Sequence, residues 1–159
     1  MTSSATVVVS TTVAASVADV WAAVSDPTAY ARWSPEAAGA VRRSGTGAWQ
    51  VGDRFTGRNR LWIPWSTSCR VVTADPEREF AFEVKLGPVT LSRWAYSVEA
   101  LPDGGTRVTE TWTDLRDGVQ GALVKPSGLF VGRGVDAAER NRATMEATLT
   151  SLTKEFGAL

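Results

Sequence analysis

The C-terminal part of the chain, residues 134–157, has the periodicity of one long amphipathic helix. Steps of four and three residues place a set of side chains on one face of such a helix: Ala138, Arg142, Met145, Leu149, Leu152 and Phe156. This face is apolar except at Arg142. A helix of about 22 residues is about 33 Å long, which is enough to cross a small domain. The pattern therefore predicts that the rest of the chain folds around this helix.

The residues before this helix have the pattern of strands separated by turns. β-Branched residues predict a first strand at residues 6–13, and capping residues at Ser16 and Asp26 predict two short helices, at residues 17–25 and 26–33. Further strands are predicted at residues 40–44, 53–62, 65–73, 79–86, 90–100 and 106–115. The order is therefore one strand, two short helices, six strands in hairpin order and a long helix.

The composition excludes several kinds of site. With 159 residues and 43% hydrophobic content, the chain is long enough for one domain, residues 1–159. Its 17 basic and 17 acidic residues balance, so no overall field attracts nucleic acid or an anionic membrane. The chain contains no histidine, which excludes Ser-His-Asp and Cys-His nucleophile systems and histidine metal sites. Proton transfer must therefore rely on carboxylates, tyrosine, lysine or water.

The single cysteine and the N-terminal residues bear on the compartment. Cys69 is the only cysteine, which excludes an intrachain disulfide and a cysteine-cluster metal site and fits a reducing cytoplasm. Residues 1–17 carry no basic residue before short apolar stretches, so they predict neither a signal peptide nor a membrane span. We therefore expect a cytoplasmic protein with no nucleic-acid partner, no membrane span, no cofactor and no bound metal.

Residues 117–134 follow neither a strand nor a helix pattern. They are rich in glycine and contain two small apolar clusters, at residues 123–124 and 129–131. A loop of this length inside a compact domain is usually functional. This segment is either a lid or entrance at one end of the sheet, or a surface loop that covers that end.

Five segments of the sequence carry a resemblance to a known family: residues 16–35, 71–76, 105–109, 139–142 and 149–152. In these segments the chain resembles the START-like, or SRPBCC, superfamily, in particular its bacterial polyketide cyclase/dehydrase-like branch. The resemblance spans nearly the whole chain and implies an α+β helix-grip fold. In this fold a seven-stranded antiparallel curved sheet wraps around the long C-terminal helix, two short helices follow the first strand, and a cavity separates sheet and helix. The resemblance implies no single function, since relatives include aromatases and cyclases, lipid carriers, hormone receptors and chaperone activators.

Alternation along the predicted strands places candidate ligand-binding residues on the inner face of the sheet. They are Phe55, Asn59, Thr67, Phe80, Phe82, Trp94 and Trp112, joined by Met145 from the helix. Together the aromatic residues suit a flat, apolar or aromatic ligand, and for each of them packing in the core is the alternative. Asn59 and Thr67 either orient a ligand carbonyl or hydroxyl or bond to each other across strands. Cys69 is expected to be a small core residue.

Glu110 is the strongest single candidate for a catalytic residue. If Val108 and Trp112 point inward, the period of two places Glu110 inward as well, where an ionised carboxylate is costly unless it is paired. Arg142 is the candidate partner. In an enzyme, Glu110 would act as general base while Arg142 and Tyr96 stabilise the enolate or alkoxide of a cyclising poly-β-ketone. In the alternative, Glu110 and Arg142 form a structural ion pair, or Glu110 reaches water at a strand end.

Three kinds of function remain open. The first is a carrier or sensor that binds a small hydrophobic molecule, such as a polyketide, a lipid or an isoprenoid. The second is a polyketide cyclase, aromatase or dehydratase with Glu110, Tyr96 and Arg142 as catalytic residues. The third is a protein-interaction module that docks through residues 123–131, and a homodimer is also open. The absence of histidine favours binding over catalysis.

Overall fold

The computed structural model describes residues 4–116 and 136–159. Its elements are β1 (Thr6–Val13), α1 (Val17–Val24), the 3-10 helix η1 (Pro27–Arg32), β2 (Ala37–Arg42), β3 (Arg54–Arg60), β4 (Pro64–Asp75), β5 (Glu79–Leu86), β6 (Val89–Ala100), β7 (Thr106–Asp114) and α3 (Ala137–Phe156). The predicted order of elements is confirmed. The predicted lid or docking segment, residues 117–134, lies outside the described residues.

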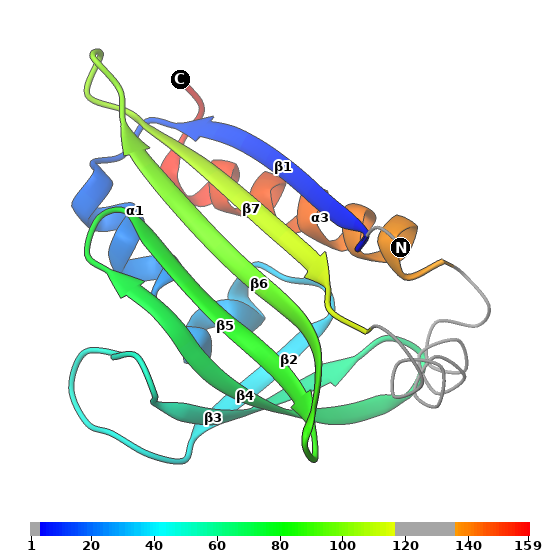
Figure 1. Ribbon diagram of the computed structural model, residues 1–159. Helices are drawn as coiled ribbons and strands as arrows, with labels where there is room; N and C mark the ends of the chain where they lie inside the picture. Colours follow the sequence, from blue (N-terminus) through cyan, green and yellow to red (C-terminus); the bar gives the residue numbers. More distant parts are fainter. Residues whose placement is uncertain (1–3, 117–135) are drawn as a thin grey trace.

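The strands form one seven-stranded antiparallel sheet in the order β1-β7-β6-β5-β4-β3-β2. Figure 1 shows the curved sheet with α3 lying behind β1 and β7. α3 packs on β1 and β7, while α1 packs on β6 and η1 on β2. The predicted α+β helix-grip fold is therefore confirmed. In the part of the chain that the structure describes, no helix is long and apolar enough to cross a lipid bilayer.

The two short helices begin where the sequence predicts a cap. Ser16 accepts a hydrogen bond from the backbone N–H of Asp19 (3.2 Å), and Asp26 accepts one from that of Thr28 (3.0 Å). Pro27 is the first residue of η1, a position where its missing N–H is not needed. As a result η1 brings Tyr30 close to Tyr96 of β6, with 5.5 Å between the ring centroids.

The buried face of α3 agrees with the predicted one at Met145, Leu149 and Leu152 and differs from it in the first half of the helix. The buried residues of this helix are Asn141, Thr144, Met145, Thr148, Leu149 and Leu152. Arg142 is exposed, so its predicted place on the buried face is wrong. The apolar pattern missed Asn141, Thr144 and Thr148 because these buried residues are polar. The hydroxyl of Thr148 donates to the backbone carbonyl of Thr144 (2.8 Å), which lets a threonine lie in the interior without an unpaired hydroxyl.

The apolar core is divided among neighbouring clusters. Leu149 and Leu152 belong to the cluster that α3 forms with the β1 side of the sheet, together with Val13, Val20, Val24, Trp33, Tyr96, Val98 and Val108. Met145 packs with Val7 and Trp112. Phe80 belongs to a cluster formed by strands β3, β4 and β5, with Phe55, Cys69, Val71, Phe82 and Val84. The second half of α3 is thus held by apolar packing.

Replacing Leu152 by alanine tests this packing. Leu152 is 1% exposed and Leu86, at the end of β5, is 56% exposed. We expect Leu152→Ala to lower the free energy of unfolding by about 3 kcal/mol, because it removes buried methyl groups and leaves a cavity. Leu86→Ala should change it by less than about 0.5 kcal/mol. Urea denaturation followed by circular dichroism measures both values, and equal losses would contradict the placement of α3 in the core.

Candidate functional site

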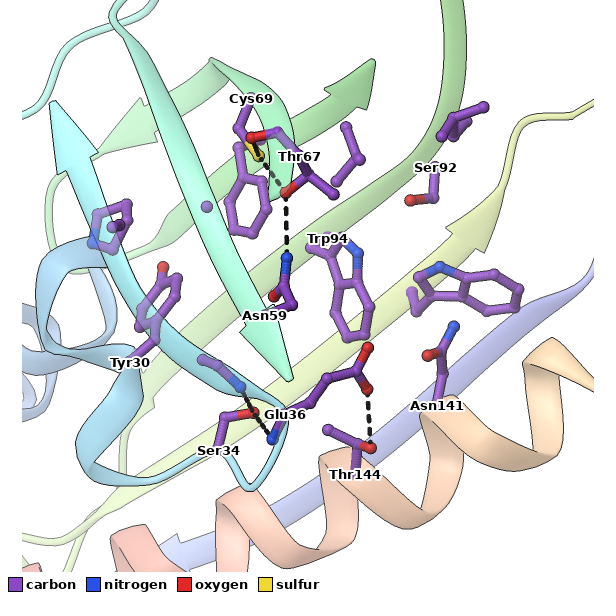
Figure 2. A pocket seen from close by; sticks show the side chains of 18 of the residues that line it. Tyr30, Ser34, Glu36, Asn59, Thr67, Cys69, Ser92, Trp94, Asn141 and Thr144 are labelled. Atoms are coloured by element: carbon purple, nitrogen blue, oxygen red, sulfur yellow. Dashed lines mark hydrogen bonds between the residues drawn. The ribbon is translucent and has the colours of Figure 1, made fainter. Parts of the chain in front are cut away.

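A cavity of about 420 Å³ lies between the inner face of the sheet and the first turns of α3. Side chains from β2 to β7 line it, and Pro27, Tyr30, Ser34 and Glu36 close one side. Figure 2 shows Asn59, Thr67 and Trp94 of the sheet facing Asn141 and Thr144 of α3. The volume is in the range of small-molecule sites, about 300 to 1,000 Å³.

Most residues that the sequence predicts for the site line this cavity: Phe55, Asn59, Thr67, Phe82, Trp94, Tyr96, Glu110 and Trp112. Phe80 and Met145 do not, because both are fully buried (0% exposed) within apolar clusters. Phe80 packs edge-on against Trp21 of α1, with 6.4 Å between ring centroids. The predicted position of Phe80 and Met145 at the cavity wall is therefore wrong. Ligand contact by the lining residues stays a prediction.

The aromatic walls are held by contacts between rings. Phe55 of β3 and Phe82 of β5 pack edge to face, with 5.2 Å between centroids and 70° between planes. Trp94 of β6 and Trp112 of β7 are directly opposite in the sheet, and their rings lie 6.5 Å apart. Tyr30 is fixed by a hydrogen bond from its hydroxyl to the carbonyl of Val24 (2.7 Å). The walls are therefore pre-formed and present flat apolar surface to the cavity.

Glu110 lies in the wall as a nearly isolated carboxyl group. It is 3% exposed and directly opposite Tyr96 in the register of β6 and β7. The Tyr96 hydroxyl donates to Oε1 of Glu110 (2.9 Å), whereas Oε2 has no hydrogen-bond partner among the described residues. Burial raises the pKa of Glu110 to about 8, and the hydrogen bond from Tyr96 opposes this shift. Glu110 is therefore mostly protonated at pH 7.

The contact with Tyr96 leaves the second oxygen of Glu110 available. When Tyr96 donates to Oε1, that oxygen acts as the acceptor, and Oε2 can then carry the acid proton. Oε2 is the atom without a partner in the described part of the chain. Glu110 can thus donate a hydrogen bond to an oxygen inside the cavity. Burial also raises the pKa of Tyr96 well above its usual value, so this phenol stays neutral.

The predicted pairing of Glu110 with Arg142 is wrong. Arg142 is exposed on α3 and does not line the cavity. The residue directly before it, Asn141, is 3% exposed and lies in the cavity wall instead. Sequence periodicity could not separate these two neighbours, because both are polar.

A second polar group, which sequence reasoning missed, lies at the α3 side of the cavity. The Thr144 hydroxyl donates to Oε2 of Glu36 (3.2 Å), and Figure 2 shows this bond beside Trp94. Burial raises the pKa of Glu36, while the positive charge of Arg140 and the bond from Thr144 oppose the shift. Asn141 and Arg140 carry buried polar atoms without hydrogen-bond partners among the described residues. The sequence signal for this group was the polar pair Asn141 and Thr144, which lie three residues apart and so share one face of the helix.

The wall opposite α3 contains a small polar set around Gly57. The Asn59 amide donates to Oγ1 of Thr67 (3.3 Å), so these two bond across strands as one prediction expected. Thr67 Oγ1 lies 3.5 Å from Sγ of Cys69, and burial raises the pKa of this thiol to about 11. Cys69 therefore stays protonated near neutral pH and is a poor nucleophile. A Cβ atom added at Gly57 would lie 2.8 Å from Thr67 Oγ1, so the glycine keeps this wall open.

Solved structures with the same fold support the architecture. A protein from Nitrosospira multiformis is 15% identical, with 96% of each chain covered and a TM-score of 0.66. The Zhui aromatase/cyclase from Streptomyces sp. R1128 is 16% identical, with 97% of this chain and 90% of that chain covered and a TM-score of 0.61. At such identities the likeness shows the fold alone.

Three further findings bear on the family of the chain. The Polyketide_cyc-like protein from Corynebacterium glutamicum is 29% identical, with 98% of this chain and 89% of that chain covered and a TM-score of 0.54. No curated protein matches the chain. The family described as "Polyketide cyclase / dehydrase and lipid transport" matches residues 4–157. The chain therefore belongs to this family of polyketide cyclase/dehydrase and lipid-transport proteins, within the SRPBCC fold.

Proposed function

We propose that this protein binds a small hydrophobic molecule, of the polyketide, lipid or isoprenoid kind, in its cavity and acts as a carrier or sensor. The observation that carries the proposal is Glu110. This carboxyl group is buried in an aromatic wall, and its Oε2 has no partner among the described residues. A buried polar atom without a partner costs free energy, which a ligand oxygen would recover.

The chemistry of the wall sets what such a ligand must be. Phe55, Phe82, Trp94 and Trp112 offer apolar surface to a ring system or chain. Protonated Glu110 donates to a carbonyl or hydroxyl oxygen on that ligand, and the Tyr96 hydroxyl keeps the carboxyl group in position. A carrier or sensor needs these two features and no further catalytic group. The family match is consistent with this reading, since its description includes lipid transport.

A polyketide cyclase or dehydratase is the second candidate, and the Glu110–Tyr96 pair favours it. A carboxyl group with a pKa of about 8 can give a proton to a leaving hydroxyl and, as carboxylate, take one from an acidic methylene. If the protein is such an enzyme, Glu110→Gln should abolish turnover of a poly-β-ketone and leave its binding intact. Equal turnover in this variant, measured in a coupled product assay, would exclude catalysis by Glu110.

Filling the cavity tests the binding proposal. Gly57 lines the cavity, and its neighbour Arg58 is exposed on the other face of β3. We expect Gly57→Leu to weaken binding of the neutral fluorophore N-phenyl-1-naphthylamine about ten-fold or more, because the added side chain occupies ligand space. Arg58→Leu, the matched control, should change it by less than about two-fold. Fluorescence titration measures both affinities, and equal affinities in the two variants would contradict ligand binding here.

The pH dependence of stability tests the state of Glu110. Its pKa is about 8 in the folded protein against an ordinary 4.5, so the folded state holds one proton more than the unfolded state between these values. The free energy of unfolding should therefore fall as the pH rises from 4.5 to 9, by up to about 5 kcal/mol relative to Glu110→Gln. Urea titrations of both proteins at several pH values give this difference. Parallel pH profiles would show that Glu110 has no raised pKa.

A further inference from the structure

The inner face of α3 changes character along the helix. Ala137, Arg140, Asn141 and Thr144 all line the cavity, and their spacing of three, four and seven residues places them on one face. Further along the same face, Leu149 and Leu152 pack in the apolar core. The helix thus presents a polar surface to the cavity and an apolar surface to the core.

Two side chains of this polar surface contain buried atoms that bond to nothing in residues 4–116 and 136–159. Asn141 is 3% exposed, and its Oδ1 has no hydrogen-bond partner there. Arg140 has two such atoms, Nε and Nη1, which are both donors. Groups of this kind in the wall of a cavity take their partner from water or from the molecule that fills the cavity.

The other basic residues of the cavity wall are already engaged. Arg116 binds the carboxylate of Asp114 with two parallel hydrogen bonds, of 2.8 and 2.7 Å. Lys85 donates to the hydroxyl of Thr90 (3.1 Å). Among the described residues that line the cavity, Arg140 therefore stands apart as the cation whose buried donors lack partners.

Glu36 does not satisfy Arg140. Its Oε2 accepts the hydrogen bond of Thr144, and no ion pair within 4 Å joins Glu36 to Arg140 in the described structure. The charge of Arg140 acts on Glu36 only at longer range. Arg140 is partly buried, and its Nε and Nη1 are enclosed without a direct anionic partner, which is unfavourable unless an acceptor is supplied.

We propose that the ligand of this cavity carries a carboxylate, bound by Arg140 and Asn141 at the α3 side, while its apolar body lies along the tryptophans. This inference rests on the proposed function. A carboxylate supplies both the negative charge and the acceptor oxygens that the Arg140 donors require, whereas a neutral carbonyl supplies no charge. Rotation of the Asn141 amide by 180° presents Nδ2 as a further donor. Figure 2 shows Asn141 extending from α3 toward the side of the cavity where Trp94 lies.

Titration calorimetry with two probes of similar shape, one charged and one neutral, tests this carboxylate site. The probes are naphthalene-2-carboxylate and its methyl ester, added to the full chain. Arg140→Gln is compared with Arg142→Gln, which removes the same charge from an exposed position two residues along the helix. We expect the unaltered protein and Arg142→Gln to bind the acid about ten-fold or more tightly than the ester. Arg140→Gln should remove this preference by weakening binding of the acid alone.

The outcomes distinguish failure of the carboxylate inference from failure of the proposed function. Equal affinity of the unaltered protein for acid and ester would overturn the carboxylate inference and leave the proposed cavity binding intact. The same loss in Arg140→Gln and Arg142→Gln would overturn it too, because it would show a general charge effect. Failure of both probes to bind the unaltered protein would contradict the proposed function and the inference together. Thermal melting by circular dichroism confirms that Arg140→Gln is folded, and the acid-to-ester ratio of the unaltered protein tests the inference without any variant.

Discussion

Burial of Leu149 and Leu152 against the β1 side of the sheet holds the second half of α3, and this packing decides where space can remain inside the fold. The sheet is wide enough that its other strands curve past the helix (Figure 1). Where α3 is polar, its side chains do not fill the space beneath β3 to β7. The cavity of about 420 Å³ is the result. The second half of α3 therefore packs in the core, and its first half borders the cavity.

This division explains why polar groups are found inside an otherwise apolar interior. Glu110, Asn141 and Arg140 each have at least one buried polar atom without a partner in the described residues, and all three line the cavity. A core built for stability alone would hold apolar side chains at these positions. Glu110 responds to its surroundings by keeping its proton, with a pKa of about 8. Glu110 in the sheet and Arg140 in the helix can then donate hydrogen bonds into the same cavity from two sides.

The sequence predicted the elements well because their signals are local. The strands at Thr6–Val13 and Glu79–Leu86 have the predicted bounds, and alternation in β7 correctly placed Val108, Glu110 and Trp112 inside. In α3 the prediction of Met145, Leu149 and Leu152 on the buried face is confirmed, and the main error was to place Arg142 there. An apolar stripe identifies a helical face only where that face is apolar, and Asn141, Thr144 and Thr148 are not. Glu36 was missed because its neighbour Thr144 is 108 residues away in the chain.

Native mass spectrometry of the purified full chain, with and without added naphthalene-2-carboxylate, tests most directly whether the cavity binds a ligand. We expect one molecule with an apolar body bound to each chain, either carried through purification or added as the probe, and released when the protein is denatured. Extraction and identification of a retained molecule would then name its chemical class. The mass of the chain alone under both conditions would contradict the claim that the cavity between the sheet and α3 is a ligand site.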